Sequence, residues 1–108
     1  APSGTALSLG DFAAKGRGTT LKKVKVMDRT KKTSLRKQGS IGFAVTRGGE
    51  IAGEHTVSFI GPNDRVELIH KANNRSIFVT GAIQSAIFLH KKKPSLYSIK
   101  DVIFSQNN

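Results

Sequence analysis

The first residues of the chain have the spacing of an amphipathic helix. Apolar residues recur at three- and four-residue intervals at Ala6, Leu9 and Ala13. Ser3, just before them, is a good N-cap, because its side-chain oxygen can accept a hydrogen bond from a free amide of the first turn. Gly16 and Gly18 follow and are typical of a helix end. The pattern therefore predicts a helix from about Gly4 to Lys15.

Alternation of apolar and polar residues after that helix predicts four short strands. The first runs from Lys23 to Met27, the second carries Ile41, Phe43 and Val45, the third runs from about Glu50 to Ile60, and the fourth from Arg65 to Lys71. Gly48-Gly49 predicts a tight hairpin between the second and third strands, since glycine adopts positive φ without steric cost. Gly61-Pro62-Asn63-Asp64 predicts the turn before the fourth strand. The polar stretch Arg29 to Gln38 is expected to be a loop.

A second helix is predicted from about Arg75 to His90. Its apolar residues follow a helical repeat at Val79, Ala82, Ile83, Ala86 and Ile87. Asn73 or Asn74 can cap its start, and Lys91 to Pro94 ends it. We expect the short apolar tail, Leu96 to Phe104, to pack on something other than this helix.

These elements predict an α+β fold for a single domain over residues 1–108. We expect one mixed four-stranded β-sheet with helices on one face. Hydrophobic residues make up 37% of the chain, and there is no Trp, so the core of so small a domain is lean. The face of the sheet without helices is therefore either polar or covered by another subunit.

Composition excludes several classes of protein. The chain has no Cys, which excludes disulfides and thiolate metal sites and fits a reducing compartment. The stretch from Ala1 to Gly10 lacks the basic start and apolar run of a signal peptide. The apolar stretches are too short to span a bilayer. We expect a cytoplasmic protein without a membrane partner.

The net charge of +11 is concentrated in one region. Between Lys15 and Arg47 there are eleven basic residues against one acid, Asp28, whereas Gly48 to His90 is slightly acidic. One function open to such a chain is a small nucleic-acid-binding module that uses Lys22 to Lys37 to follow phosphates. No aromatic residue interrupts that stretch, so the stacking surface of a single-strand binder is missing. We favour a solvated loop and expect no nucleic-acid partner.

Three other patterns carry little chemistry. Gly16-Arg17-Gly18 begins like a dinucleotide fingerprint but lacks the third glycine and the preceding strand. The scattered histidines, His55, His70 and His90, make a poor metal site without Cys, so we expect no bound metal. Ser58, His70 and Asp64 are the residue types of a catalytic triad, but the sequence around Ser58 is not a nucleophile turn.

The predicted start of the first helix is a candidate anion-binding site. Its free amides and the positive end of the helix dipole form a site for a carboxylate or phosphate. Gly4 lets a ligand approach the backbone closely, and Thr5 adds a hydroxyl donor. Plain N-capping by Ser3 is the alternative interpretation, because such caps are common.

Several motifs in order resemble one enzyme family over nearly the whole chain. They are Ala1 to Ala6, Ile41 to Ala44, Arg47 to Val57, Asp64 to Ala72, Asn74-Arg75, Phe78 to Ala82 and Leu96 to Val102. Together they resemble the C-terminal substrate-binding and tetramerisation domain of 4-hydroxy-tetrahydrodipicolinate reductases, also called dihydrodipicolinate reductases. Ala1 to Ala6 is similar to the segment that follows the family's catalytic His-His-x-x-Lys motif.

The resemblance implies an oxidoreductase of the diaminopimelate route to lysine, a branch of amino-acid biosynthesis. In that family NADPH or NADH delivers hydride to a cyclic dicarboxylate with loss of water. The resemblance implies that Gly4 and Thr5 bind a substrate carboxylate, and that Arg75 and Phe78 lie where substrate and cofactor meet. It also implies a homotetramer built through the sheet, whose face without helices would serve oligomerisation.

The resemblance further implies that this chain contains no catalytic residue. The family's N-terminal dinucleotide-binding domain, which binds most of the NADPH or NADH, is expected to be absent from residues 1–108. We therefore expect this fragment alone to be inactive, with its apolar tail exposed, disordered or packed on a neighbour. A stand-alone assembly module without any ligand is a further hypothesis.

Overall fold

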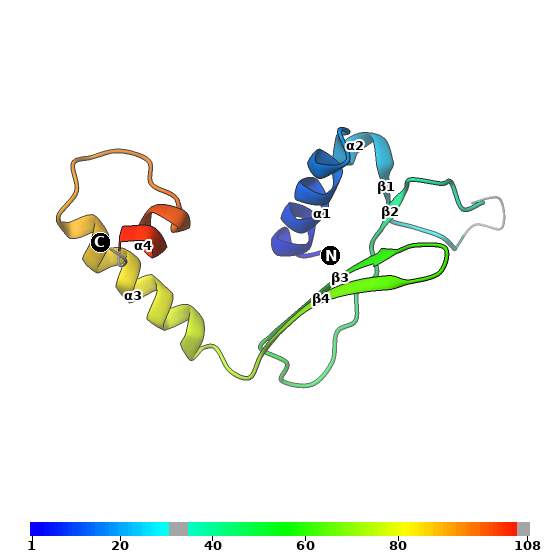
Figure 1. The fold of residues 1–108 in the computed structure, drawn as a ribbon. Coiled ribbons are helices and arrows are strands. Elements are labelled where there is room, and N and C mark those ends of the chain that lie inside the picture. The colour runs from blue at the N-terminus through cyan, green and yellow to red at the C-terminus, as the bar shows by residue number, and fades with distance from the viewer. Residues whose placement is uncertain (31–34, 106–108) are drawn as a thin grey trace. The chain divides into compact units, whose positions relative to one another are not determined.

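The computed structural model describes residues 1–30 and 35–105, which fall into two compact units (Figure 1). The first unit holds residues 1–50 and 54–71, and the second holds residues 51–53 together with the chain from residue 72. Helices and strands occur together, so the predicted α+β class is confirmed. The strands, however, form two sheets of two strands each. The prediction of one four-stranded sheet is corrected accordingly.

Helix α1, Gly4–Gly16, begins at the predicted residue and ends one residue after the predicted Lys15. Ser3 is its N-cap, and the Ser3 Oγ accepts a hydrogen bond from the Ala6 amide at 3.2 Å. Gly18 has a φ of 68° and donates its amide to the Lys15 carbonyl at 2.9 Å. The glycines of the incomplete dinucleotide fingerprint therefore end this helix, because positive φ releases the chain from the helical path.

Small residues allow α1 to pack closely in the first unit. Ala14 is fully buried, and Gly10 is buried beside it. A Cβ atom on Gly10 would lie 2.6 Å from Cζ of Phe43 and 3.3 Å from Cδ1 of Leu21. Leu21 opens α2, Leu21–Val24, a short helix that contacts α1. The core of this unit thus depends on the absence of a side chain at Gly10.

The first sheet is much shorter than predicted. Strands β1, Lys25–Val26, and β2, Ile41–Gly42, pair in parallel, with Lys25 opposite Ile41. Residues 23 and 24 belong to α2, which corrects the strand expected from Lys23 to Met27. Lysines are better helix formers than strand formers, which favours the helical turn.

The predicted hairpin at Gly48-Gly49 is also wrong. Gly49 does turn the chain, with a φ of 52°. However, β2 pairs with β1, and the residues between β2 and β3 are not in strands. That stretch contains Gly48 and Gly49 and several small residues, which offer little side-chain packing to hold a ladder.

The second sheet is the hairpin of β3, Gly53–Ile60, and β4, Arg65–Ala72, as predicted. The Gly61 amide donates to the Asp64 carbonyl at 2.9 Å and closes the turn. Ser58 contacts Glu67 across the hairpin, and Glu54 contacts Lys71. Both pairs indicate the same register, and that register places His55 opposite His70.

Helix α3, Ser76–His90, and helix α4, Ile99–Ser105, form the second unit. The N-cap residue of α3 is Arg75, which makes no side-chain cap hydrogen bond. The Asn74 side chain, one residue earlier, accepts the Ser76 amide at 2.9 Å. The two helices contact each other, and the rings of Phe88 and Tyr97 meet edge to face with centroids 5.6 Å apart. The expectation that the tail packs away from the preceding helix is therefore wrong. An aromatic pair and the buried Val102 hold it there.

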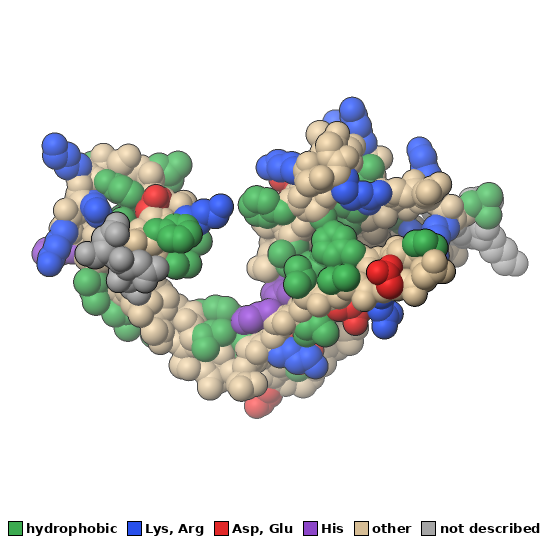
Figure 2. All heavy atoms as spheres, viewed as in Figure 1, with side chains coloured by type: hydrophobic (Ala, Val, Ile, Leu, Met, Phe, Trp, Pro, Cys, Tyr) green, Lys and Arg blue, Asp and Glu red, His purple; other side chains and the backbone are tan. Residues whose placement is uncertain are grey.

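Large apolar side chains remain exposed in both units (Figure 2). On the hairpin, Leu68 is 63% exposed and Ile69 56%. On α3 the apolar residues whose spacing predicted the helix stay in solvent, and Ile83 is 56% exposed. None of the helices in the described residues is long and apolar enough to cross a membrane. A lean core is thus accompanied by unusually large apolar exposure.

Candidate functional site

The start of α1 is open to solvent. Gly4 and Thr5 are both exposed, and a Cβ atom on Gly4 would meet nothing within 4 Å. Among the hydrogen bonds of the described residues, none uses the amides of Gly4 and Thr5 or the Thr5 hydroxyl. Ala6 donates to Ser3 Oγ, and Leu7 donates to the Ser3 carbonyl at 3.1 Å. Three neighbouring donors at Gly4 and Thr5 are therefore available to an anion.

The electrostatics of this helix start favour a negative ligand. The first turn of α1 contains no acidic side chain. The positive end of the helix dipole is therefore not neutralised by the chain's own carboxylates within that turn. A carboxylate placed there would gain charge-assisted hydrogen bonds, which are stronger than neutral ones.

His55 is a neighbour of this site that the sequence did not reveal. Its Nε2 lies 3.2 Å from Ser3 Oγ, so β3 contacts the N-cap of α1. From the sequence we expected no metal at the scattered histidines and had no reason to place His55 at this site. Fifty-two positions separate the two residues, and no local spacing could have signalled the pair. His55 and Ser3 are both partly buried.

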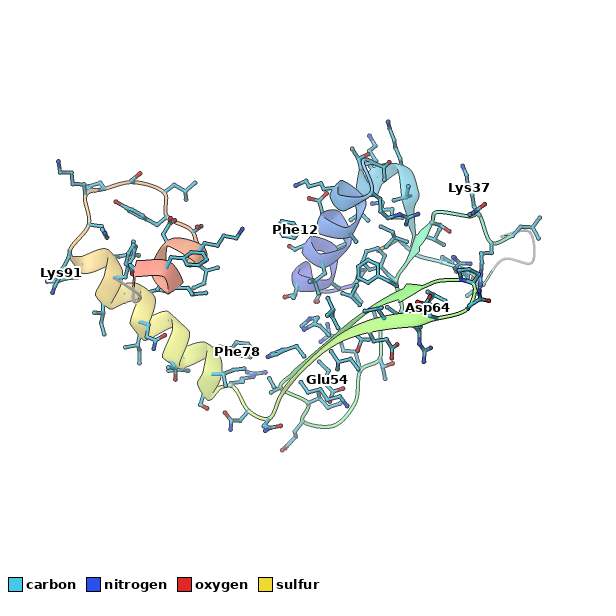
Figure 3. All side chains as sticks on the ribbon, viewed as in Figure 1. Phe12, Lys37, Glu54, Asp64, Phe78 and Lys91 are labelled. Carbon is cyan, nitrogen blue, oxygen red and sulfur yellow. The ribbon has the colours of Figure 1, made fainter. Side chains whose placement is uncertain are left out.

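The other two candidate residues, Arg75 and Phe78, lie together at the start of α3 in the second unit. Phe78 projects from the first turn and is 53% exposed (Figure 3). Its amide donates to the Arg75 carbonyl at 3.1 Å, and the Arg75 side chain is exposed. Both side chains are therefore accessible, and their predicted role near substrate and cofactor stays a prediction.

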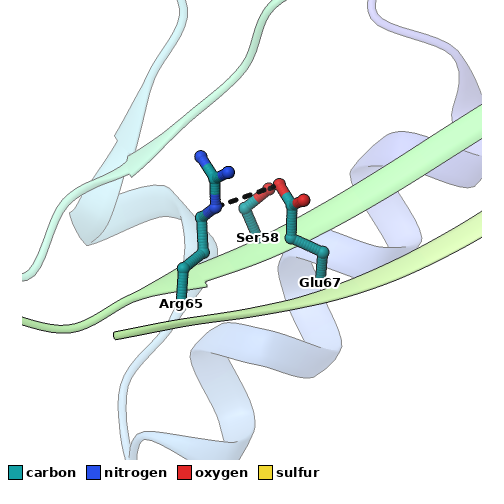
Figure 4. Close-up of polar contacts among 3 residues, drawn as sticks. All are labelled: Ser58, Arg65 and Glu67. Carbon is teal, nitrogen blue, oxygen red and sulfur yellow. Dashed lines mark hydrogen bonds and ion pairs between the residues drawn. The ribbon is translucent and has the colours of Figure 1, made fainter. Parts of the chain in front are cut away.

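The structure does not form the catalytic triad of Ser58, His70 and Asp64 that was considered from the sequence. Ser58 Oγ donates to Glu67 Oε1 at 2.8 Å, and Arg65 Nε lies 3.5 Å from the same oxygen (Figure 4). Asp64 lies in the turn beyond these residues, with its carboxylate against Gly61. The hydroxyl of Ser58 thus serves a surface polar cluster of the hairpin.

Other chemistry is equally sparse in the part of the chain that the structure describes. It brings no three residues among His, Cys, Asp and Glu together in a way that could hold a metal ion. The basic segment Lys22 to Lys37 lies partly outside the described residues, since residues 31–34 are not among them. Asp28, within it, accepts hydrogen bonds from the Thr30 amide and hydroxyl, which lower the pKa of its carboxyl.

Comparison with known proteins agrees with the resemblance described above. Residues 1–103 match the family described as "Dihydrodipicolinate reductase, C-terminus". A 4-hydroxy-tetrahydrodipicolinate reductase of Rhodopseudomonas palustris is 52% identical over 103 residues, which are 95% of this chain and 38% of that protein. Proteins of the same name from Beijerinckia indica and Bartonella quintana are 50% and 48% identical, with the same coverage.

The chain spans about 38% of the length of these curated relatives. None of these proteins bears a name that suggests nucleic-acid binding, so the comparisons give no support to that alternative. The family match extends from the open helix start at residue 1 through the hairpin and α3 into α4. The chain therefore belongs to the family of dihydrodipicolinate reductase C-terminal domains.

Proposed function

We propose that this chain is the substrate-binding and oligomerisation domain of an NADPH- or NADH-dependent 4-hydroxy-tetrahydrodipicolinate reductase. Such an enzyme serves the diaminopimelate route to lysine in the cytoplasm. The observation that carries the proposal is the open, unneutralised start of α1 in a chain of this family. Gly4 and Thr5 would bind one carboxylate of a small cyclic dicarboxylate.

The site would work by positioning and by charge. A carboxylate can accept hydrogen bonds from the amides of Gly4 and Thr5 and from the Thr5 hydroxyl. Each bond to the charged group contributes about 1.5–3 kcal/mol to binding. The helix dipole adds about 0.3–1 kcal/mol at an exposed site. Two or three such bonds would also hold the ring in one orientation, which favours reaction at a single atom.

The nicotinamide nucleotide supplies the hydride in this family of reactions. The described residues contain no strand followed by a glycine-rich turn and a helix, the arrangement that binds a pyrophosphate. Gly16 and Gly18 instead end α1. We therefore assign most nucleotide contacts to sequence outside residues 1–108. Arg75 and Phe78 are the accessible candidates in this chain for contacts near the meeting point of substrate and cofactor.

The exposed apolar residues of the β3–β4 hairpin support a homotetramer. Phe59, Val66, Leu68 and Ile69 are each about half exposed or more in the single chain. Burying one such side chain fully contributes about 1.5–3 kcal/mol, so several together stabilise an assembly. The mass in solution, measured by light scattering, should correspond to four chains. Leu68→Lys should lower that mass, whereas Thr56→Lys, an already exposed polar position of β3, should change it less.

Substitution of Thr5 tests the carboxylate site directly. Thr5→Val keeps the shape of the side chain and removes its hydroxyl donor. In the natural protein that contains this segment, with any flanking sequence kept, the KM for the dicarboxylate should rise about tenfold or more. Ser8→Ala is the matched control, because Ser8 is an exposed hydroxyl one turn further along α1, and it should leave the KM unchanged. Equal kinetics for Thr5→Val and the parent protein would contradict the assignment.

A further inference from the structure

Ser3 and His55 form the side-chain hydrogen bond with the largest sequence separation in the described part of the chain. Ser3 Oγ lies 3.2 Å from His55 Nε2 and also 3.2 Å from the Ala6 amide nitrogen that it caps. The contact ties strand β3 to the first turn of α1, directly beside the exposed amides of Gly4 and Thr5. The contact therefore places His55 one hydrogen bond away from the N-cap of the proposed carboxylate site.

The direction of the Ser3–His55 bond decides what Ser3 can do. A serine hydroxyl has one proton to donate and two lone pairs with which to accept. One lone pair already accepts the Ala6 amide. If His55 Nε2 carries no proton, Ser3 donates to it and has no proton left for a ligand. If Nε2–H donates to Ser3, both lone pairs are occupied and the hydroxyl proton is free to bond to an anion.

We propose that His55 is a positioning residue for the carboxylate site, with Nε2–H donating to Ser3 Oγ so that the Ser3 hydroxyl adds a donor for the bound anion. The inference rests on the proposed function. A carboxylate at the helix start favours this arrangement, because it can accept a hydrogen bond from the freed Ser3 hydroxyl. The ring also keeps the N-cap of α1 in place against β3.

The surroundings of His55 bring little negative charge to this face of the hairpin. His70 faces it from β4 in the register of the hairpin. Glu54 precedes His55 and Lys71 follows His70, so their side chains point to the other face of the hairpin, where they contact each other. From α1, the first turn brings no acidic side chain. The bound dicarboxylate would therefore be the main negative charge on this face.

The test uses pyridine-2,6-dicarboxylate as probe and calorimetry as the measurement, on the protein with its natural flanking sequence. His55→Leu removes the donor and should weaken binding about tenfold or more. His55→Gln keeps an N–H donor at nearly the same reach and should bind within about threefold of the parent. His70→Gln is the matched control from the opposite strand and should also remain within about threefold.

Rescue by glutamine separates positioning from packing. If His55→Leu fails to fold, as circular dichroism would show, the folded His55→Gln variant still tests the proposal, because glutamine retains the donor and should bind within about threefold of the parent.

The outcomes distinguish this inference from the function on which it rests. If the parent protein itself does not bind the probe, the carboxylate site is refuted and the role of His55 with it. If the parent binds and His55→Leu, shown to be folded, binds equally well, only the positioning role is refuted. Loss of binding in His55→Gln as large as in His55→Leu would also refute it, since a retained donor should rescue.

Discussion

Helices α1 and α3 are of similar length, yet they use their apolar residues in opposite ways. Helix α1, Gly4–Gly16, buries its small residues Gly10 and Ala14. Helix α3, Ser76–His90, is much richer in large apolar side chains, and none of its residues is buried. In this chain the hydrophobicity of a helix therefore does not measure how far it is buried. How far a helix is buried depends instead on how closely its backbone approaches its neighbours, and only small residues allow a close approach.

The difference has a functional consequence. The first unit depends on close packing around α1, which holds the start of that helix, the proposed carboxylate site, in place. The second unit holds together through a few contacts between α3 and α4 and leaves an apolar stripe in water. Exposed apolar surface of this kind is typical of an interaction face. The first unit thus combines a closely packed helix start with an exposed apolar hairpin, and the second unit leaves the apolar stripe of α3 available for contact with further protein.

The largest expected effect comes from filling the space at Gly10. In Gly10→Val the new Cβ would lie 2.6 Å from Phe43 Cζ, so either the Phe43 ring or α1 must shift. Overpacking of this kind lowers the free energy of unfolding by about 1–3 kcal/mol. Denaturant unfolding measures it. Gly16→Val is the control, since nothing lies within 4 Å of a Cβ there. Equal stability of the two variants would show that α1 is not closely packed.

A second substitution compares the two faces of α3. Phe88 meets Tyr97 edge to face, whereas Ile83 points to solvent and is 56% exposed. Phe88→Ala should lower the free energy of unfolding by about 1–2 kcal/mol, from lost burial and the lost aromatic pair. Ile83→Ala should change the stability of the single chain by no more than about 0.5 kcal/mol. A larger loss from Ile83→Ala in the assembled protein than in dilute single chains would show that another chain covers the stripe.

The helix caps give a third and smaller effect. Ser3→Ala removes the acceptor of the Ala6 amide, and Asn74→Ala removes the acceptor of the Ser76 amide. Each should lower the free energy of unfolding by about 1 kcal/mol. Only Ser3→Ala should also weaken binding of a dicarboxylate, because it alters the start of α1. Calorimetry together with thermal unfolding would separate the two effects, and weakened binding in Asn74→Ala alone would contradict the assignment.

The elements that depend on local signals were predictable from the sequence. Ser3 and the glycines after residue 15 marked both ends of α1, and Gly61 to Asp64 marked the turn of the hairpin. The parallel pairing of β1 and β2 was not predictable, because it joins two-residue segments that are far apart in the sequence, Lys25–Val26 and Ile41–Gly42. The chain could instead have paired around Gly48-Gly49, and local propensity does not decide between the two.

The candidate site was predictable in part for the same reason. The helix start and its donors follow from neighbouring residues, so Gly4 and Thr5 stood out in the sequence. His55 did not, since its contact with Ser3 exists only once β3 is placed beside α1. Long-range polar contacts depend on tertiary structure, whereas caps and turns depend on a few residues in a row.

The smallest effect is a response of α4 to acid that α1 should not share. Asp101 accepts hydrogen bonds from the amide and hydroxyl of Ser98 at 2.6 and 2.8 Å, and these lower the pKa of its carboxyl from the ordinary 3.8. The Asp101 carboxylate therefore contributes its full stabilisation of α4 above the ordinary pKa of 3.8. This stabilisation is lost as the pH falls through the lowered pKa of the folded state. Amide exchange and chemical shifts of α4, followed by NMR below about pH 4, should show it fraying before α1, whose N-cap Ser3 does not titrate in this range. Asp101→Asn should remove this acid response, and fraying of α4 at the same pH in that variant would contradict the role of the carboxylate.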